Sequence, residues 1–132
     1  RVELADVLVR KADLDDARTV LASIPEDTDG RSRPQNRLEF VEEAAGMDSL
    51  DSLQAMVESD PTDLDARYAL AVVQVVAEEY EHSLLTCLDI LRDDREFRDD
   101  IGRLTMIRIF DVLGKGNELA TKYRRKLFNA LH

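Results

Sequence analysis

Apolar residues recur along this chain at intervals of three and four positions, the spacing that places them on one face of an α-helix. The stretch from Leu64 to Arg95 shows the pattern best, with an apolar helix, a polar break and then an amphipathic helix. A helical pair of this size cannot bury its own apolar surface, so it needs neighbouring helices on both sides. We therefore expect the remaining sequence to supply those neighbours.

The same periodicity continues through the rest of the chain and is interrupted at turns. Pro25, Gly46 and Gly114 each follow an apolar stripe and are expected to end a helix. The pattern predicts one all-α domain over residues 1–132. We expect a right-handed α-solenoid, a stack of about four antiparallel hairpins with about eight helices in all. The hairpins are expected at about residues 2–24, 34–58, 63–93 and 101–131.

Short polar residues mark the starts of several predicted helices. Asp48 or Ser49 can cap the fourth helix, and Asn117 can cap the eighth. Thr62, with Asp65 three residues later, resembles a capping box at the start of the fifth helix.

Composition narrows the partners that this chain can bind. It has 132 residues, of which 44% are hydrophobic and 35% charged, as expected for one folded domain. The net charge of −10 argues against nucleic acid and anionic membranes as partners. The longest uncharged apolar run, residues 69–77, is far shorter than the ~20 residues of a membrane span.

The charge is unevenly distributed. Residues 1–100 carry a net charge of −15, whereas residues 101–132 carry +5. One interpretation is a solvated helix face with chance clustering. The other is an oriented contact between the basic C-terminal end and a protein partner.

Cysteine usage fits a reducing compartment, and we expect a cytoplasmic protein. Cys87 is the only cysteine, so no internal disulfide can form. It falls on the apolar stripe of the sixth predicted helix, where a small core residue is expected. Because the chain starts at Arg1 without a methionine and already within a helical pattern, we also expect it to be a fragment or a processed form.

No arrangement of residues in the sequence predicts an enzyme. His82 and His132 have no second histidine or cysteine at the spacing of metal ligands. The segment 114–116 is too short for a phosphate-binding loop, and the acidic pairs lack the spacing of a calcium loop. The sequence therefore predicts no catalytic residue, cofactor or metal.

A repeat links two parts of the chain. The segment 14–17 (LDDA) opens the second predicted helix as 80–83 (YEHS) opens the sixth, at an offset of 66 residues. This offset is close to two tetratricopeptide periods of about 34 residues each. In the second copy, Arg67 and Arg95 depart from that repeat where it usually has a tryptophan-type residue and a proline. The matching residues are Leu70, Ala71, Tyr80, Ser83 and Ile90.

Three segments carry a more specific resemblance. They are DPTDLDARYALA at residues 60–71, EEYEHSLLTCLDILRDDREFRDD at 78–100 and FDVLGKGNELATKYRRKLFNALH at 110–132. On these segments the chain resembles the C-terminal region of the bacterial thioredoxin-like co-chaperones, the chaperedoxin or YbbN-type family. The resemblance implies a helical tail behind an upstream thioredoxin-fold domain, in a holdase that passes unfolded clients to the chaperonin. Any redox activity of such a protein lies outside this chain.

The last predicted helix holds the candidate binding site. Its apolar arc, which includes Tyr123 and Leu131, is expected to pack on the preceding helix. Phe128 points roughly 120° away from that arc, beside Arg124, with Arg125 further round. An exposed aromatic residue beside arginines is a plausible anchor for a partner. The alternative is that Phe128 caps the core and the arginines favour a helix C-terminus. The candidate partner-binding residues are Tyr123, Arg124, Arg125, Phe128 and Leu131.

The resemblance and the uneven charge imply two alternative functions. The first is a protein-binding module of a cytosolic co-chaperone, which binds unfolded clients, chaperonin or both. The second is a structural module that self-associates, as a weak homodimer, or orients the upstream domain. A chain that stays monomeric would exclude the homodimer.

Overall fold

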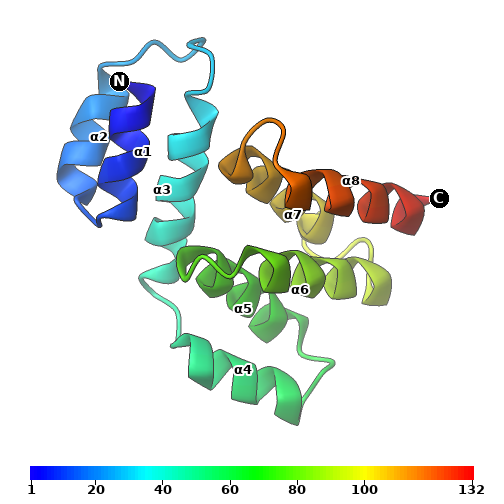
Figure 1. Cartoon of the computed structure of the whole chain (residues 1–132). Helices are drawn as coiled ribbons and strands as arrows, with labels where there is room; N and C mark the ends of the chain where they lie inside the picture. Colours follow the sequence, from blue (N-terminus) through cyan, green and yellow to red (C-terminus); the bar gives the residue numbers. More distant parts are fainter.

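Eight α-helices and no strand make up the computed structural model, which describes all 132 residues (Figure 1). The prediction of an all-α protein with about eight helices is confirmed. None of the helices is both long and apolar enough to span a bilayer. The helices are α1 (Val2–Arg10), α2 (Leu14–Ala22), α3 (Ser32–Ala44), α4 (Leu50–Ser59), α5 (Leu64–Val76), α6 (Tyr80–Asp93), α7 (Ile101–Leu113) and α8 (Glu118–Leu131).

Two apolar cores are joined by α3. The larger core has 17 buried residues, drawn from α3 and from α5 to α8, and the smaller has six, drawn from α1, α2, the turn after α2, and α3. Phe40 of α3 belongs to the larger core and Leu38 to the smaller. Residues two apart are rotated by about 200° around the helix axis, so their side chains point to nearly opposite sides. α3 can therefore stand between the two units, as Figure 1 shows.

The arrangement of α3 and α4 differs from the predicted hairpin over residues 34–58. α3 packs against α1, α5 and α7, whereas α4 packs on α5. The reason is that the stripe of α4 finds its apolar partners on α5, where Leu53 clusters with Leu70 and Val73. α3 has apolar residues on two faces, and both are already covered by other helices.

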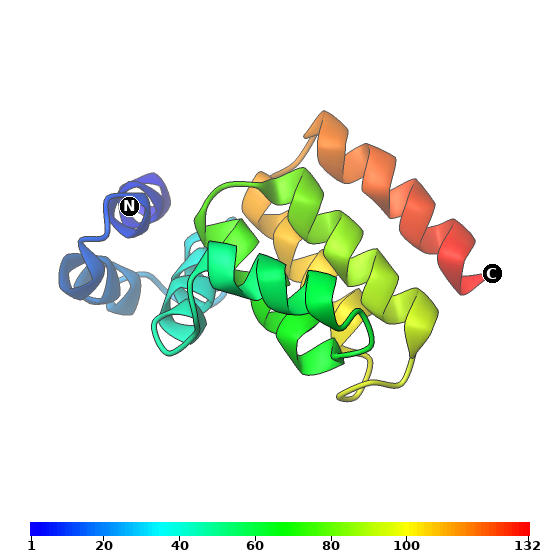
Figure 2. The same ribbon diagram turned by 90° about the horizontal axis from the view of Figure 1, so that it is seen from below.

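The helices of the C-terminal half lie in layers. α6 packs against α5, α7 and α8, and it lies beside α8 in the view of Figure 2. The α1–α2 pair stands apart from this stack, on the far side of α3. Because α7 and α8 both contribute residues to the larger core, this core determines which of their faces are buried.

Local capping follows the sequence with one exception. The side chains of Ser49 and Asn117 each accept a hydrogen bond from a backbone N–H in the first turn of α4 and α8, as predicted. The capping box predicted at Thr62 is wrong. Asp63 caps α5 instead. The N-cap of α5 therefore lies one residue after Thr62, whose hydroxyl instead donates to the Asp60 carboxylate at 2.6 Å.

Candidate functional site

Tyr123 attaches α8 to the rest of the stack. Its side chain is 1% exposed, and its hydroxyl donates a hydrogen bond to the Glu81 carboxylate of α6 at 2.8 Å. Burial raises the pKa of Tyr123 to about 12, and the bond to Glu81 contributes to the same shift. Tyr123 was predicted as a partner-binding residue, but a side chain this deeply buried cannot contact a partner on the surface. Its role is to fix the position of α8.

Phe128, by contrast, lies on the surface. Its side chain is 61% exposed, and its ring lies 4.4 Å from the ring of His132, centroid to centroid. The core beneath α8 is closed by Leu127 and Tyr123. Phe128 therefore does not cap the core, which was the alternative interpretation of this residue.

A groove of about 450 Å³ runs between α7 and α8 beside Phe128. Most of its lining is apolar, and it includes Ile107, which is 45% exposed. We refer to it as the C-terminal groove. Among the predicted residues it contains Arg124, Phe128 and Leu131, while Arg125 is exposed but does not line it. Its lining residues are Ile107, Phe110, Asp111, Arg124, Leu127, Phe128 and Leu131.

One arginine and one aspartate supply the charges in the lining of the C-terminal groove. The Arg124 guanidinium lies 5.1 Å from the centre of the Phe110 ring, a cation–π contact that holds it over the groove. Arg124, Arg125 and Lys126 form no ion pair within the chain. The one carboxylate in the lining, that of Asp111, accepts a hydrogen bond from the Asn36 amide at 2.8 Å. The groove therefore combines an apolar floor with one arginine that has no acidic partner, and Arg125 and Lys126 follow it on α8 outside the lining.

Sequence reasoning missed the α7 side of this groove. Ile107 lies in an apolar run from Met106 to Phe110 that only Arg108 interrupts, so the run itself does not separate its exposed side chain from buried ones such as Met106. Exposure of Ile107 depends on where α8 lies, which is a tertiary property. No local signal could have identified it.

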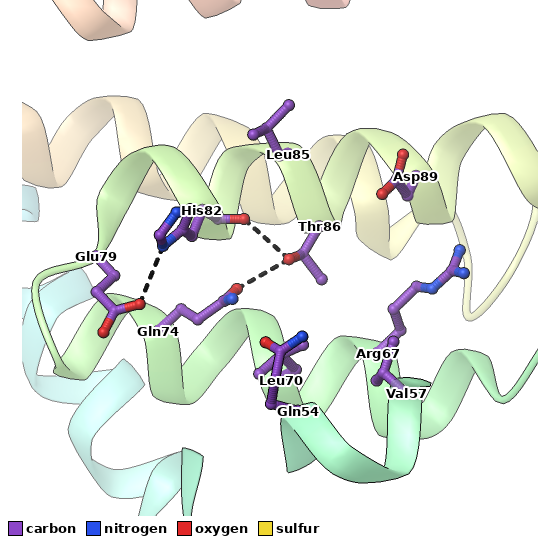
Figure 3. Close-up of a pocket in the computed structure, with 10 residues that line it drawn as sticks. All are labelled: Gln54, Val57, Arg67, Leu70, Gln74, Glu79, His82, Leu85, Thr86 and Asp89. Carbon is purple, nitrogen blue, oxygen red and sulfur yellow. Dashed lines mark hydrogen bonds and ion pairs between the residues drawn. The ribbon is translucent and has the colours of Figure 1, made fainter. Parts of the chain in front are cut away.

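A second hollow, of about 460 Å³, lies across α4, α5 and α6 (Figure 3). Its lining is mostly polar. The Nδ1 atom of His82 lies 3.1 Å from the Glu79 carboxylate, and the Thr86 hydroxyl lies 2.9 Å from both the Gln74 amide oxygen and the His82 carbonyl oxygen. A hydroxyl held between two acceptors is not directed at the imidazole of His82, so these residues do not form a nucleophile and base pair.

Two further observations bear on possible chemistry. No group of three or more histidine, cysteine, aspartate or glutamate side chains is placed to hold a metal ion. Cys87 is fully buried, and burial raises its thiol pKa to about 12. Because the thiolate is the reactive form, this thiol is chemically inert and serves as a core residue, as predicted.

Comparison with known proteins identifies the repeat. The family described as tetratricopeptide repeat matches residues 43–132, from the last turn of α3 to the end of α8. The match includes the C-terminal groove and the hollow of Figure 3, and it leaves out α1 and α2. No curated protein matches the sequence.

Proposed function

This chain belongs to the tetratricopeptide repeat family, and we propose that it docks a protein partner through the C-terminal groove. Repeats of this family generally mediate protein–protein interactions. The observation that carries the proposal is the exposure of Phe128 and Ile107 on the two sides of one groove. Apolar side chains gathered in this way are typical of a binding surface, whereas isolated ones are ordinary.

The stack itself supports this surface. In a helical solenoid each pair buries its apolar surface against the next pair. α7 packs against α6 and α3, and α8 packs against α6 and α7. Within residues 1–132 nothing covers the side of α7 and α8 that holds Ile107 and Phe128. A partner helix placed there would bury both residues as a further repeat would.

The proposed partner carries acidic residues beside an apolar anchor. Arg124 at the groove and the neighbouring Arg125 and Lys126 have no acidic partner within the chain. A carboxylate of the partner would form an ion pair with one of these cations. An apolar side chain of the partner would fill the space beside Phe128. Aromatic and arginine side chains often supply a large part of the energy at such contacts.

We further propose that the chain is the helical part of a bacterial cytoplasmic co-chaperone, with chaperonin or unfolded clients as partners. The sequence resemblance of the segments ending in residues 110–132 supports this role. That proposal includes a thioredoxin-fold domain upstream of Arg1. Reading the native gene upstream of this position tests it, and a different upstream domain would contradict it.

Binding to purified chaperonin tests the docking proposal. The double variant Phe128→Ala, Arg124→Ala should bind about tenfold or more weakly, since it removes the anchor and its neighbouring cation. Its folding should be unaffected, because Phe128 is 61% exposed. Circular dichroism of the variant checks that point.

A matched control is available on α6. Leu85 is 42% exposed and Arg92 is exposed, and neither lines the C-terminal groove. The double variant Leu85→Ala, Arg92→Ala removes the same kinds of side chain and should bind like the original chain. Equal binding by the Phe128 and Arg124 variant would contradict the docking proposal.

A second candidate function is self-association. The −15 charge of residues 1–100 and the +5 charge of residues 101–132 could pair between two copies. Sedimentation velocity at several concentrations separates this function from partner binding. A chain that remains monomeric at low salt excludes it, and a dimer that dissociates as salt is added supports it.

A further inference from the structure

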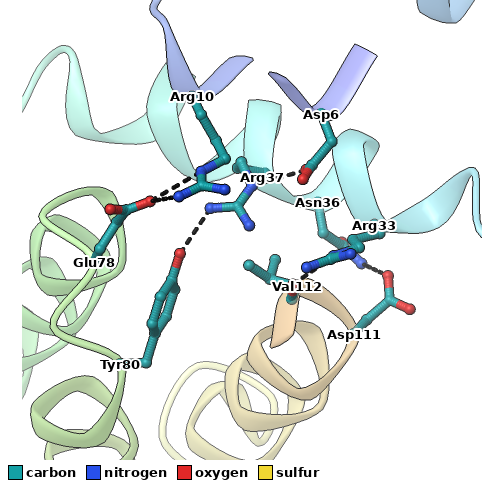
Figure 4. Close-up of polar contacts among 9 residues, drawn as sticks. All are labelled: Asp6, Arg10, Arg33, Asn36, Arg37, Glu78, Tyr80, Asp111 and Val112. Carbon is teal, nitrogen blue, oxygen red and sulfur yellow. Dashed lines mark hydrogen bonds and ion pairs between the residues drawn. The ribbon is translucent and has the colours of Figure 1, made fainter. Parts of the chain in front are cut away.

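Three arginines line one pocket where the N-terminal helices meet the repeat stack (Figure 4). The pocket has a volume of about 450 Å³. It lies among the end of α1, one side of α3 and the turns that follow α5 and α7. We refer to it as the arginine pocket. Its lining residues are Arg10, Arg33, Arg37, Glu78, Tyr80, Val112, Leu113, Asn117 and Leu119.

Arg37 is held rigidly at this pocket. It is 7% exposed, its Nε donates to the Asp6 carboxylate at 2.8 Å, and its Nη1 donates to the Tyr80 hydroxyl at 2.7 Å. Its other terminal nitrogen, Nη2, has no hydrogen-bond acceptor in the protein. The bonds of Nε and Nη1 thus hold the guanidinium in place, and the N–H groups of Nη2 have no acceptor.

Arg33 has donors to spare as well. Its Nε donates to the backbone carbonyl of Val112 at 2.8 Å, at the C-terminal end of α7. Its guanidinium has no carboxylate partner, so both of its terminal nitrogens are free to bind a ligand. The N-terminal end of α8, at Asn117 and Leu119, lines the same pocket and adds its own positive potential.

The third arginine is paired. The Nε and Nη2 atoms of Arg10 both lie 3.1 Å from one oxygen of Glu78. Glu78 is the one acidic residue in the lining, against three arginines. Asp6 pairs with Arg37 and Glu78 with Arg10, so Arg33 is the one arginine of the pocket without an acidic partner, in a chain whose net charge is −10.

We propose that the arginine pocket binds a small tetrahedral oxyanion, a phosphate group. Guanidinium groups donate paired hydrogen bonds that match phosphate oxygens. Arg37 and Arg33 are already oriented by their bonds to Asp6, Tyr80 and Val112, so little side-chain freedom is lost on binding. The bound anion would bridge α3 to the turn after α7. It would therefore stabilise the attachment of the α1–α3 unit to the repeat stack.

Isothermal titration of the full chain with inorganic phosphate, at constant ionic strength, tests this proposal. We expect saturable binding of about one phosphate per chain. Arg33→Gln should weaken this binding about tenfold or more, and Arg33→Lys should weaken it less, since lysine keeps the charge but not the paired donors. Arg33 is exposed, so these variants should remain folded.

Arg92→Gln is the matched control. Arg92 is exposed on α6, has no ion pair and does not line the pocket, so this variant changes the net charge equally. It should bind phosphate like the original chain. The proposal is overturned if phosphate shows no saturable binding, or if Arg33→Gln and Arg92→Gln weaken it equally. Acetate that binds as tightly as phosphate would overturn the assignment to a tetrahedral anion.

Discussion

Ala12 and Glu78 lie 66 residues apart and share one left-handed backbone conformation, with φ of 64° and 62°. The backbone N–H of Ala12 bonds to the carbonyl of Val9 at 3.0 Å, and that of Glu78 bonds to the carbonyl of Val75 at 2.9 Å. The turn after α1 and the turn after α5 are therefore the same structure. The 66-residue offset found in the sequence reflects two copies of one helical pair.

This conformation makes Ala12→Gly a stabilising substitution. A residue with a Cβ atom in the left-handed region costs roughly 1–2 kcal/mol, and glycine avoids this cost but loses more freedom on folding. We expect a net gain of about 0.5–1 kcal/mol in the free energy of unfolding. Urea unfolding measures it.

The control for that substitution is Ala55→Gly. Ala55 is exposed within α4, where helical backbone gives glycine no advantage. The free energy of unfolding of this variant should fall by about 1 kcal/mol. A loss of stability in Ala12→Gly as well would contradict the strain assigned to the turn.

The contact between α6 and α7 depends on Gly102. A Cβ atom at this position would lie 3.1 Å from the backbone oxygen of Cys87 and 3.3 Å from the backbone nitrogen of Leu91. Gly102→Ala should destabilise the fold by about 1–3 kcal/mol, because backbone cannot move aside as a flexible side chain can. Gly46→Ala, with no atom within 4 Å, should instead be neutral or stabilising by up to about 1 kcal/mol. Thermal unfolding of both variants checks this difference in sign.

The two apolar cores predict two levels of stability. Leu21 is 3% exposed in the smaller core. Leu21→Ala should lower the free energy of unfolding of the α1–α2 pair by about 2–5 kcal/mol. Hydrogen exchange should show faster exchange of the amides in α1 and α2, while those of α5 and α6 keep their protection. Leu84→Ala, in the larger core, should instead accelerate exchange throughout the chain. An equal loss of protection everywhere in Leu21→Ala would show that the cores unfold together.

The bond between Tyr123 and Glu81 predicts a dependence of stability on pH. Hydrogen bonds from Tyr123 and then Lys122 lower the pKa of Glu81, so the folded chain binds its proton less readily than the unfolded chain. This contribution is present above the ordinary glutamate pKa of about 4.3 and is lost as the pH falls through the lower folded value. Tyr123→Phe should therefore flatten the acid side of the stability profile, measured as urea midpoints against pH.

The alkaline side tests the same bond. Because the pKa of Tyr123 is raised to about 12, its neutral hydroxyl stabilises the fold up to the unfolded tyrosine pKa of about 10. Stability should then fall as the pH rises from about 10 to about 12, and Tyr123→Phe should lack this part of the fall. Glu81→Gln should reproduce the flattened acid side. A Tyr123→Phe profile that matches the original chain at both ends would exclude the coupling.

The sequence by itself determined the helices, because helix formation and helix ends depend on neighbours three and four residues away. Periodicity and turn residues predicted all eight helices, and Ser49 and Asn117 were correctly identified as caps. Thr62 was misassigned because the adjacent Asp63 can cap the same helix, and it is the Asp63 carboxylate that accepts the hydrogen bond from the Ala66 N–H. The 66-residue repeat was also visible, since each copy carries its own turn.

Tertiary structure alone decided which faces are covered. The sequence placed Tyr123 on the packing arc of α8 and Phe128 away from it, but only the packing of α8 on α6 as well as α7 bonds Tyr123 to Glu81. Arginine is rarely buried, so nothing local indicates that Arg37 is. Its burial needs Asp6 and Tyr80, which lie 31 and 43 residues away in sequence. Such contacts depend on how distant helices pack, and the local pattern of residues does not encode that packing.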